Sequence, residues 1–189
     1  MFAKIYLKIR TFIRHQILHI DDRTQLEVAV ANGLTIGKDC HVMGECIIDP
    51  GHCWLIEIGD RVTLAPRVHV LAHDASTKRP LGYTALGRVK IGSDVFVGAG
   101  TIILPGVEIG DRVVIGAGSV VSKNIPANSV VVGNPARVIA SYDDYVAKRK
   151  NQMQIKPCYD YSYTINQITP EKKEQMIKEI KEKGGGFVQ

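Results

Sequence analysis

Aromatic residues are scarce in this chain of 189 residues. They make up only 6% of it, with a single tryptophan, whereas hydrophobic residues as a whole make up 45%. That apolar content, together with a modest net charge, excludes a disordered chain. A composition rich in valine, isoleucine and glycine but poor in aromatics favours short strands joined by tight turns.

Paired cysteines and long apolar runs are also missing. The four cysteines (Cys40, Cys46, Cys53 and Cys158) include no Cys-x-x-Cys pair, so the common zinc spacings are absent. No apolar stretch is long enough to span a bilayer, and basic residues interrupt the N-terminus too often for a signal peptide. We therefore expect a cytoplasmic protein with free thiols.

The charge is unevenly spread. The net charge is +5, and the segment before Asp21 carries Lys4, Lys8, Arg10 and Arg14 without any acid. A basic chain can bind nucleic acid, a membrane surface or an anionic cofactor. The sequence contains no pattern of aromatic and basic residues typical of RNA- or DNA-binding modules, so we expect no nucleic-acid partner.

An aliphatic residue recurs every six positions in the middle of the chain. The uninterrupted run is Ile91, Val97, Ile103, Ile109, Ile115 and Val121, and glycine directly follows four of the six. The same frame is present earlier, over residues 36–48 and 58–70. Two breaks interrupt it, namely four additional residues between Ile48 and Ile58 and an excursion over residues 75–90.

A period of six fits neither an α-helix nor an amphipathic strand. It fits a coil in which a short strand and a turn together use six residues, so that each aliphatic points inward and stacks on its equivalent one coil away. We expect the glycine and polar residues that follow to form the turns. The alternative is a β-sandwich, whose strands alternate with period two and turn about every 8–12 residues.

The segment Val89–Ile139 resembles the hexapeptide acyltransferases, particularly the branch of maltose, galactoside and nodulation-factor O-acetyltransferases. The resemblance rests on the repeat and on the GNPAR motif at Gly133–Arg137. It implies an all-β core built as a left-handed parallel β-helix, whose handedness the period alone does not give. It also implies a homotrimer with active sites between subunits, and acetyl-CoA as the acetyl donor.

The organisation that follows has three parts. Residues 1–25 are an N-terminal amphipathic helix, 26–140 the left-handed β-helix with its excursion loop 75–90, and 141–189 a C-terminal helical extension. Apolar residues within 2–18 recur at helical spacing. This helix either caps the open end of the β-helix or lies on an anionic membrane surface through residues 1–20.

Two helices are expected in the C-terminal extension. The first covers Tyr142–Gln152. The second starts at Thr169-Pro170, which places a good N-cap residue before a proline at the first helical position. It should end near Lys183, before Gly184. Nothing in this segment has a catalytic pattern.

His73 is the candidate catalytic base. It lies where the second block of repeats enters the excursion, the position that the family's catalytic histidine occupies. A neutral imidazole can take the proton of a hydroxyl that attacks acetyl-CoA, and such base catalysis contributes about 10²–10⁴-fold. The neighbouring Asp74 could bind a substrate hydroxyl or be a solvated turn residue. Tyr83, in the excursion, could line the acceptor pocket or pack.

The remaining histidines of the repeat region raise a metal alternative. Zinc enzymes on this fold need three well-placed histidines, but His41, His52 and His69 fall in no supporting pattern. We expect His41 and His69 on outward-facing turns. We therefore assign no metal ligand and expect no metal requirement.

The resemblance places the acetyl-CoA site along the late coils. Small residues let the donor arm approach the backbone, and basic side chains can offset phosphate charge. Phe96 stands where this branch often has tryptophan, so it keeps an apolar face without an indole donor. The candidate donor-binding residues are Phe96, Ala99, Ala117, Ser122, Lys123, Asn134, Pro135 and Arg137.

These features predict an acetyl-CoA-dependent O-acetyltransferase that acts on a sugar hydroxyl, with direct transfer in a ternary complex. A surface-polysaccharide unit is one possible acceptor. Two alternatives are an N-acetyltransferase that modifies a sugar or drug amine, and a non-catalytic trimeric scaffold.

Overall fold

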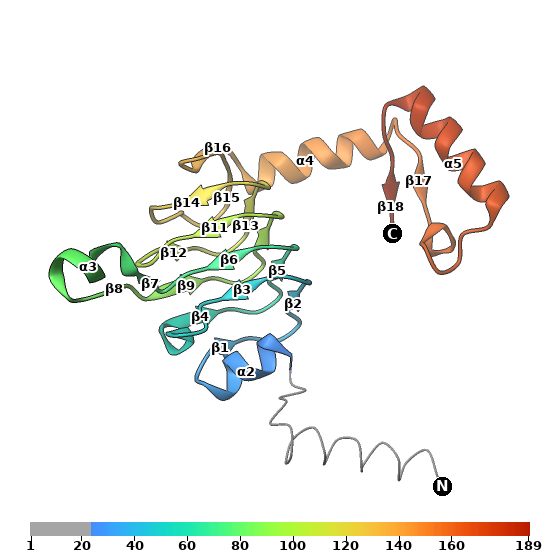
Figure 1. Ribbon diagram of the computed structural model, residues 1–189. Coiled ribbons are helices and arrows are strands. Elements are labelled where there is room, and N and C mark those ends of the chain that lie inside the picture. The colour runs from blue at the N-terminus through green and yellow to red at the C-terminus, as the bar shows by residue number, and fades with distance from the viewer. Residues whose placement is uncertain (1–23) are drawn as a thin grey trace, which may run out of the picture. The chain divides into compact units, whose positions relative to one another are not determined.

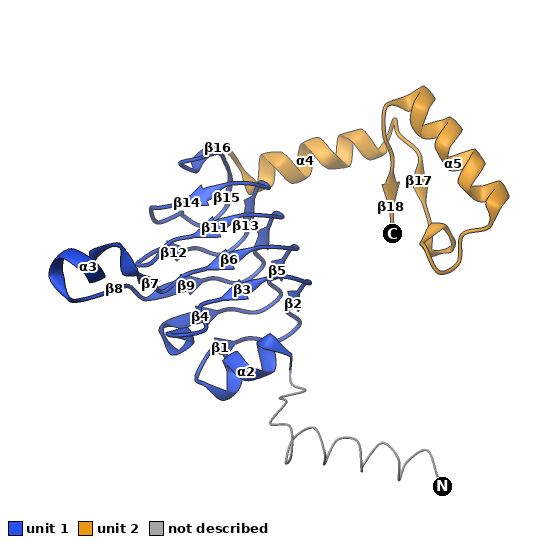
Figure 2. Cartoon of the chain, in the orientation of Figure 1, with its two compact units in different colours: residues 1–139 blue, residues 140–189 orange. Residues whose placement is uncertain are grey.

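The structure is a computed structural model that describes residues 24–189. The helix predicted over 2–18, with its roles as a cap or membrane contact, lies outside the described residues. The chain divides into two compact units, residues 1–139 and 140–189 (Figure 2). In the part of the chain that the structure describes, no helix is long and apolar enough to cross a membrane.

The first unit winds into coils whose short strands stack in three sheets (Figure 1). The first sheet has β1 (Thr35–Ile36), β4 (Ile56–Ile58), β9 (Val89–Ile91) and β12 (Glu108–Ile109). The second has β2 (His41–Val42), β5 (Thr63–Leu64), β10 (Phe96–Val97), β13 (Val113–Ile115), β15 (Ser129–Val132) and β16 (Arg137–Ser141). The third has β3 (Ile47–Ile48), β6 (His69–Val70), β11 (Ile102–Ile103) and β14 (Val120–Val121).

Successive coils pair in parallel, so the fold is a parallel β-helix. Val97 of β10 is in register with Leu64 one coil before and with Ile115 one coil after. Ile103 of β11 is likewise in register with Val70 and Val121. All of these side chains are at most 1% exposed. Their burial confirms the inward aliphatic position of the repeat. Burying each of these side chains contributes about 1.5–3 kcal/mol.

The glycine after each inward aliphatic has a different role from the predicted one. We expected it to supply a turn conformation, but Gly92 has no positive φ. A Cβ on Gly92 would lie 2.7 Å from the carbonyl carbon of Gly110 in the next coil. Glycine is therefore required by the close approach of stacked backbones. The left-handed corner positions belong to other residues, such as Asp94 and Arg112, with φ of 58° and 55°.

The first strand lies where the repeat frame begins, but a helix precedes it within the range assigned to the β-helix. Residues 25–31, most of which fall within the range 26–140 assigned to the β-helix, form the helix α2 (Gln25–Ala31), and β1 follows at Thr35. Thr24 caps α2, since its hydroxyl accepts from the backbone N–H of Glu27, whose side chain in turn accepts from the N–H of Thr24. This capping box favours a helix at this point. Ala29 of α2 is buried in the core.

The excursion predicted over 75–90 is an arm with its own structure. It leaves through β7 (His73–Asp74), continues as the 3₁₀ helix η3 (Ala75–Thr77) and α3 (Lys78–Leu81), and returns through β8 (Ala85–Leu86). The strands β7 and β8 pair antiparallel, with His73 opposite Leu86. Figure 1 shows this arm projecting from the coils. His73 therefore lies at the base of the arm.

The second unit contains α4 (Tyr142–Met153), β17 (Cys158–Tyr159), the 3₁₀ helix η4 (Tyr161–Tyr163), α5 (Pro170–Lys183) and β18 (Phe187–Val188). Thr169 caps α5 and Gly184 ends it in a left-handed conformation, as the sequence predicts. The short strands β17 and β18 pair in parallel. Tyr159 is buried, and its hydroxyl donates to the carboxylate of Glu179 at 2.9 Å.

Candidate active site

His73 and Asp49 form a hydrogen-bonded pair at one corner of the β-helix. Nδ1 of His73 lies 2.5 Å from Oδ2 of Asp49. Asp49 directly follows β3, and His73 follows β6, which pairs with β3. Stacking of the two coils therefore brings together residues that are 24 positions apart.

The carboxylate of Asp49 is saturated with donors. Its side chain is 0% exposed. Oδ2 also accepts from the backbone N–H of Ala72 at 2.8 Å, and Oδ1 accepts from the N–H groups of Gly51 and His52, each at 3.0 Å. Burial raises the pKa of Asp49, but the hydrogen bonds from Ala72, His73 and Gly51 outweigh it, so the pKa lies below its ordinary value. Asp49 is therefore ionised at neutral pH.

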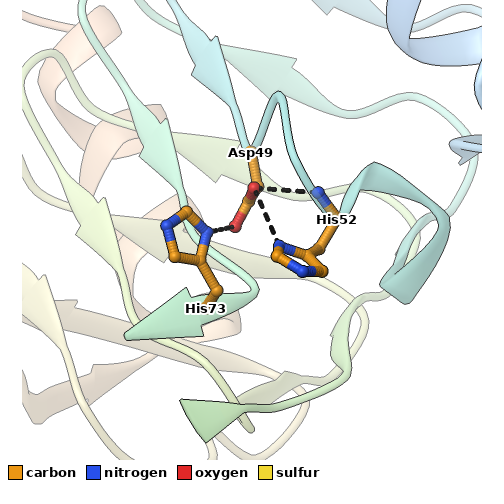
Figure 3. Close-up of side chains that lie close together, drawn as sticks. All are labelled: Asp49, His52 and His73. Carbon is orange, nitrogen blue, oxygen red and sulfur yellow. Dashed lines mark hydrogen bonds and ion pairs between the residues drawn. The ribbon is translucent and has the colours of Figure 1, made fainter. Parts of the chain in front are cut away.

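The ionised carboxylate fixes the tautomer of His73. An acceptor-only group beside Nδ1 requires the proton on that nitrogen, which leaves Nε2 with its lone pair. Figure 3 shows the far nitrogen of the ring pointing away from Asp49. The His73 side chain is 33% exposed. The pair thus presents a proton acceptor to solvent and holds a negative charge that stabilises the imidazolium once Nε2 has taken a proton.

The sequence prediction did not include Asp49. This residue lies at the end of an early coil, outside the segment that carries the strong resemblance. The available signal was the four-residue break between Ile48 and Ile58. That break forms a wide turn, which begins with Asp49 and contains the 3₁₀ helix η2 (Cys53–Leu55).

His52, in the same wide turn, also lies beside the pair. Its ring centroid is 5.1 Å from that of His73 and 5.3 Å from that of Trp54. Its Nδ1 lies 3.8 Å from Oδ1 of Asp49 and is buried without a hydrogen-bond partner. We expected His41 and His69 on outward-facing turns, but they lie on the strands β2 and β6.

Asp49, His52 and His73 each offer one ligand atom within 4.8 Å of the others. Such a set can attract a divalent cation. Two ligands at about 2.0–2.2 Å from one ion lie about 3 Å apart or more, whereas Nδ1 of His73 and Oδ2 of Asp49 are 2.5 Å apart. A cation would have to separate the pair, so the arrangement fits a hydrogen bond better than a metal centre.

The two candidate acceptor residues lie on the arm. The carboxylate of Asp74 accepts from the N–H of Ser76 at 2.8 Å and caps η3, and this hydrogen bond lowers the pKa of Asp74. Tyr83 is 79% exposed, and its carbonyl accepts from the hydroxyl of Thr77. The contacts of both residues are local to the arm, and a role in acceptor binding stays a prediction for each.

Most of the candidate donor-binding residues border the third sheet. Ala99 and Ala117 precede β11 and β14 at one corner, and Ser122 and Lys123 follow β14 at the corner where His73 follows β6. The GNPAR turn closes the sheet edge, since the N–H of Val120 donates to the carbonyl of Gly133.

The members of the GNPAR turn differ in their surroundings. Asn134 and Pro135 are exposed within the turn. The exposed Arg137 donates to the carbonyl of Ala136. Phe96 lies on a different surface, the outer face of the second sheet, and is 46% exposed. Acetyl-CoA binding by these residues stays a prediction.

The chain is similar to known transferases. Residues 88–123 match the bacterial transferase hexapeptide family with its six repeats. Protein CapG of Staphylococcus aureus is 37% identical over 79% of this chain and 86% of its own length. A maltose O-acetyltransferase of Clostridium difficile 630 has a similar structure, with 45% identity and a TM-score of 0.53 over 58% of this chain and 59% of that enzyme.

A hexapeptide-repeat acetyltransferase of Vibrio cholerae, solved with acetyl-CoA, also has a TM-score of 0.53, with 30% identity over 58% of this chain and 61% of its own. This chain thus spans about three fifths of the length of the two solved enzymes. The coiled fold and these likenesses define a transferase. The chain belongs to the hexapeptide-repeat transferases and is an acyltransferase.

Proposed function

We propose that this acyltransferase moves an acetyl group from acetyl-CoA to a sugar hydroxyl, with His73 as the general base. The observation that carries the proposal is the hydrogen bond between Nδ1 of His73 and the buried carboxylate of Asp49. It leaves Nε2 free to accept a proton at the surface. The similarity to the maltose O-acetyltransferase supports a sugar hydroxyl as the acceptor.

His73 has two tasks in this reaction. Its Nε2 removes the hydroxyl proton while the hydroxyl oxygen attacks the thioester carbonyl of acetyl-CoA. The ionised Asp49 stabilises the resulting imidazolium. When the tetrahedral intermediate collapses, the C–S bond breaks and Nε2 returns the proton to the sulfur. The products are an acetyl ester and the free thiol of coenzyme A, and no covalent bond to the enzyme forms.

The arrangement of residues around the third sheet supports acetyl-CoA binding along its outer face. Most of the predicted donor-binding residues lie around the outer face of this sheet, at two of its corners and at its last edge. His73 lies at one of those corners. Lys123 is exposed at this corner, where its charge can offset a phosphate of acetyl-CoA. The Vibrio cholerae enzyme, solved with acetyl-CoA, supports the choice of donor.

The same proposal includes the left-handed sense of the coils and a homotrimer whose active sites lie between subunits. Membership of the family supports both. A unit or precursor of a surface polysaccharide is the acceptor we favour. An amine acceptor is the second candidate, because a base beside an exposed site can equally deprotonate the ammonium intermediate formed when an amine attacks acetyl-CoA.

The test combines a substitution with an acceptor screen. His73→Ala should lower kcat by about 10²–10⁴-fold, because the base is lost, and leave acetyl-CoA binding by calorimetry unchanged. Mass spectrometry of the product, with alkaline hydrolysis of the ester, separates O- from N-acetylation. Near-normal turnover in the His73→Ala variant would exclude His73 as the base.

A further inference from the structure

The wide turn formed by the four-residue break carries more than Asp49. It also carries Trp54, which is 57% exposed, although Cys53 before it is buried and Leu55 after it is half-buried against the core. Cys53, directly before it, is 1% exposed. The exposed indole leaves a large flat apolar surface near the His73–Asp49 pair, and such a surface can pack against a ligand.

The backbone at Trp54 is held firmly. A Cβ on Gly33 would lie 3.0 Å from the Cβ of Trp54 and 3.6 Å from its Cα, so the loop after α2 packs directly against this residue. The thiol of Cys53 lies 3.4 Å from the carbonyl oxygen of Ala29 in α2. The wide turn therefore packs against α2, and these contacts hold the backbone that carries the exposed indole.

The indole, the imidazole of His52 and the catalytic imidazole form a continuous row of rings. The centroids of Trp54 and His52 are 5.3 Å apart, and those of His52 and His73 are 5.1 Å apart. His52 separates the indole from His73 by one ring. The two contacts place the indole two ring-to-ring steps from His73. A ligand that covers both the indole and His52 is therefore expected to bring a hydroxyl near His73.

We infer that Trp54 is the acceptor-binding platform of the enzyme and that the acceptor is a pyranose ring. One face of a pyranose presents a patch of C–H groups, which matches the flat apolar surface of an indole, while its hydroxyls project from the ring edge. An aromatic surface with a few polar groups beside it fits such an amphipathic ligand. An acyclic hydroxyl donor lacks the matching face.

This inference rests on the proposed function, but a separate signal tests it. Trp54 is the only tryptophan in the chain, so tryptophan fluorescence reports on this position alone. Methyl glucopyranoside, methyl galactopyranoside and their 2-acetamido forms are titrated into the full chain, and galactitol serves as the acyclic control. The pyranosides should give a saturable change in fluorescence and galactitol none. The His73→Ala variant should give the same response, because binding does not need the base.

Kinetics with substituted Trp54 form the second arm. Trp54→Ala keeps the Cβ that packs against Gly33, so the fold is expected to persist. It should raise KM for the acetylated pyranoside about 3–10-fold and leave KM for acetyl-CoA unchanged, whereas Trp54→Phe should retain most of the affinity. The matched control is Tyr161→Ala, which removes an aromatic of similar exposure, 60%, from the second unit.

The outcomes separate the two proposals. Fluorescence saturation without acetyl transfer supports the platform and overturns the proposed function. Acetyl transfer to a pyranoside that leaves the fluorescence unchanged overturns the platform. An unchanged KM for that pyranoside in Trp54→Ala, together with a smaller oligomer in light scattering, also overturns it and shows that Trp54 packs against a second copy of the chain.

Discussion

The side chains of His73 and Asp49 meet across two stacked coils, with Nδ1 2.5 Å from Oδ2. Asp49 reaches the histidine because β3 stacks on β6, and three backbone N–H groups hold its carboxylate in place. A histidine held in this way has a fixed tautomer.

Asp49→Asn should lower kcat by about 10²–10⁴-fold, because an amide neither stabilises the imidazolium nor fixes the proton on Nδ1. KM for acetyl-CoA should change little. Steady-state kinetics with both substrates, compared with His73→Ala, provide the measurement, and circular dichroism checks the fold. If the asparagine variant turns over at the wild-type rate, His73 works without a carboxylate partner.

Treatment with EDTA should leave activity unchanged. Excess Zn²⁺ should inhibit, because an ion bound by Asp49, His52 and His73 would break the hydrogen bond between Asp49 and His73 and block proton transfer by the imidazole. Inhibition should be reversed by EDTA. Loss of activity on chelation, restored by a stoichiometric metal ion, would contradict the assignment of these residues as a proton-transfer site.

Gly92→Ala should destabilise the protein by about 1–3 kcal/mol, because its Cβ would press on the backbone of the next coil. Gly44→Ala is the matched control, since a Cβ there meets nothing within 4 Å. Urea unfolding of both variants measures the difference. Equal stability of the two variants would show that the stacked coils move apart at little cost.

Alkaline pH should loosen the second unit. Burial, with the hydrogen bond to Glu179, raises the pKa of Tyr159 from 10.0 to about 12. Because the folded state holds this proton more tightly, its stabilisation is complete below pH 10.0 and is lost as the pH rises toward about 12.

Tyrosinate absorbance and circular dichroism of the full chain can follow this change. One tyrosine should ionise late in the wild type but not in Tyr159→Phe, and the helical signal of that variant should depend less on pH over this range. Tyr161→Phe, which alters an exposed tyrosine of the same unit, should behave like the wild type. Identical alkaline profiles for wild type and Tyr159→Phe would refute the prediction.

The prediction of the repeat succeeded because its cause is local. An aliphatic such as Val97 returns to the inside of the coil every six residues, so the period alone indicates which side chains stack. The prediction was less accurate where glycine is concerned. Position 92 requires glycine because the backbone of the next coil passes close to it. The two segments are 18 residues apart, so the local sequence pattern does not indicate this contact.

The candidate site was only partly predictable for a related reason. His73 marks the end of a block of repeats, which the sequence displays directly. Asp49, His52 and Trp54 lie in the other irregular segment, and their importance depends on which coil stacks on which and on the width of one turn. The sequence showed that the repeat is interrupted there, but it did not show that the interruption lies at the same corner of the β-helix as His73.

The sequence by itself determined the coil, its inward aliphatic residues and the position of His73, the proposed base, because each depends on spacing along the chain. Only the tertiary structure decided what surrounds the base. Stacking of β3 on β6 places a buried carboxylate on Nδ1 of His73. The wide turn anchored on α2 then places the rings of His52 and Trp54 beside it. These contacts join distant segments, so packing of the coils determines them.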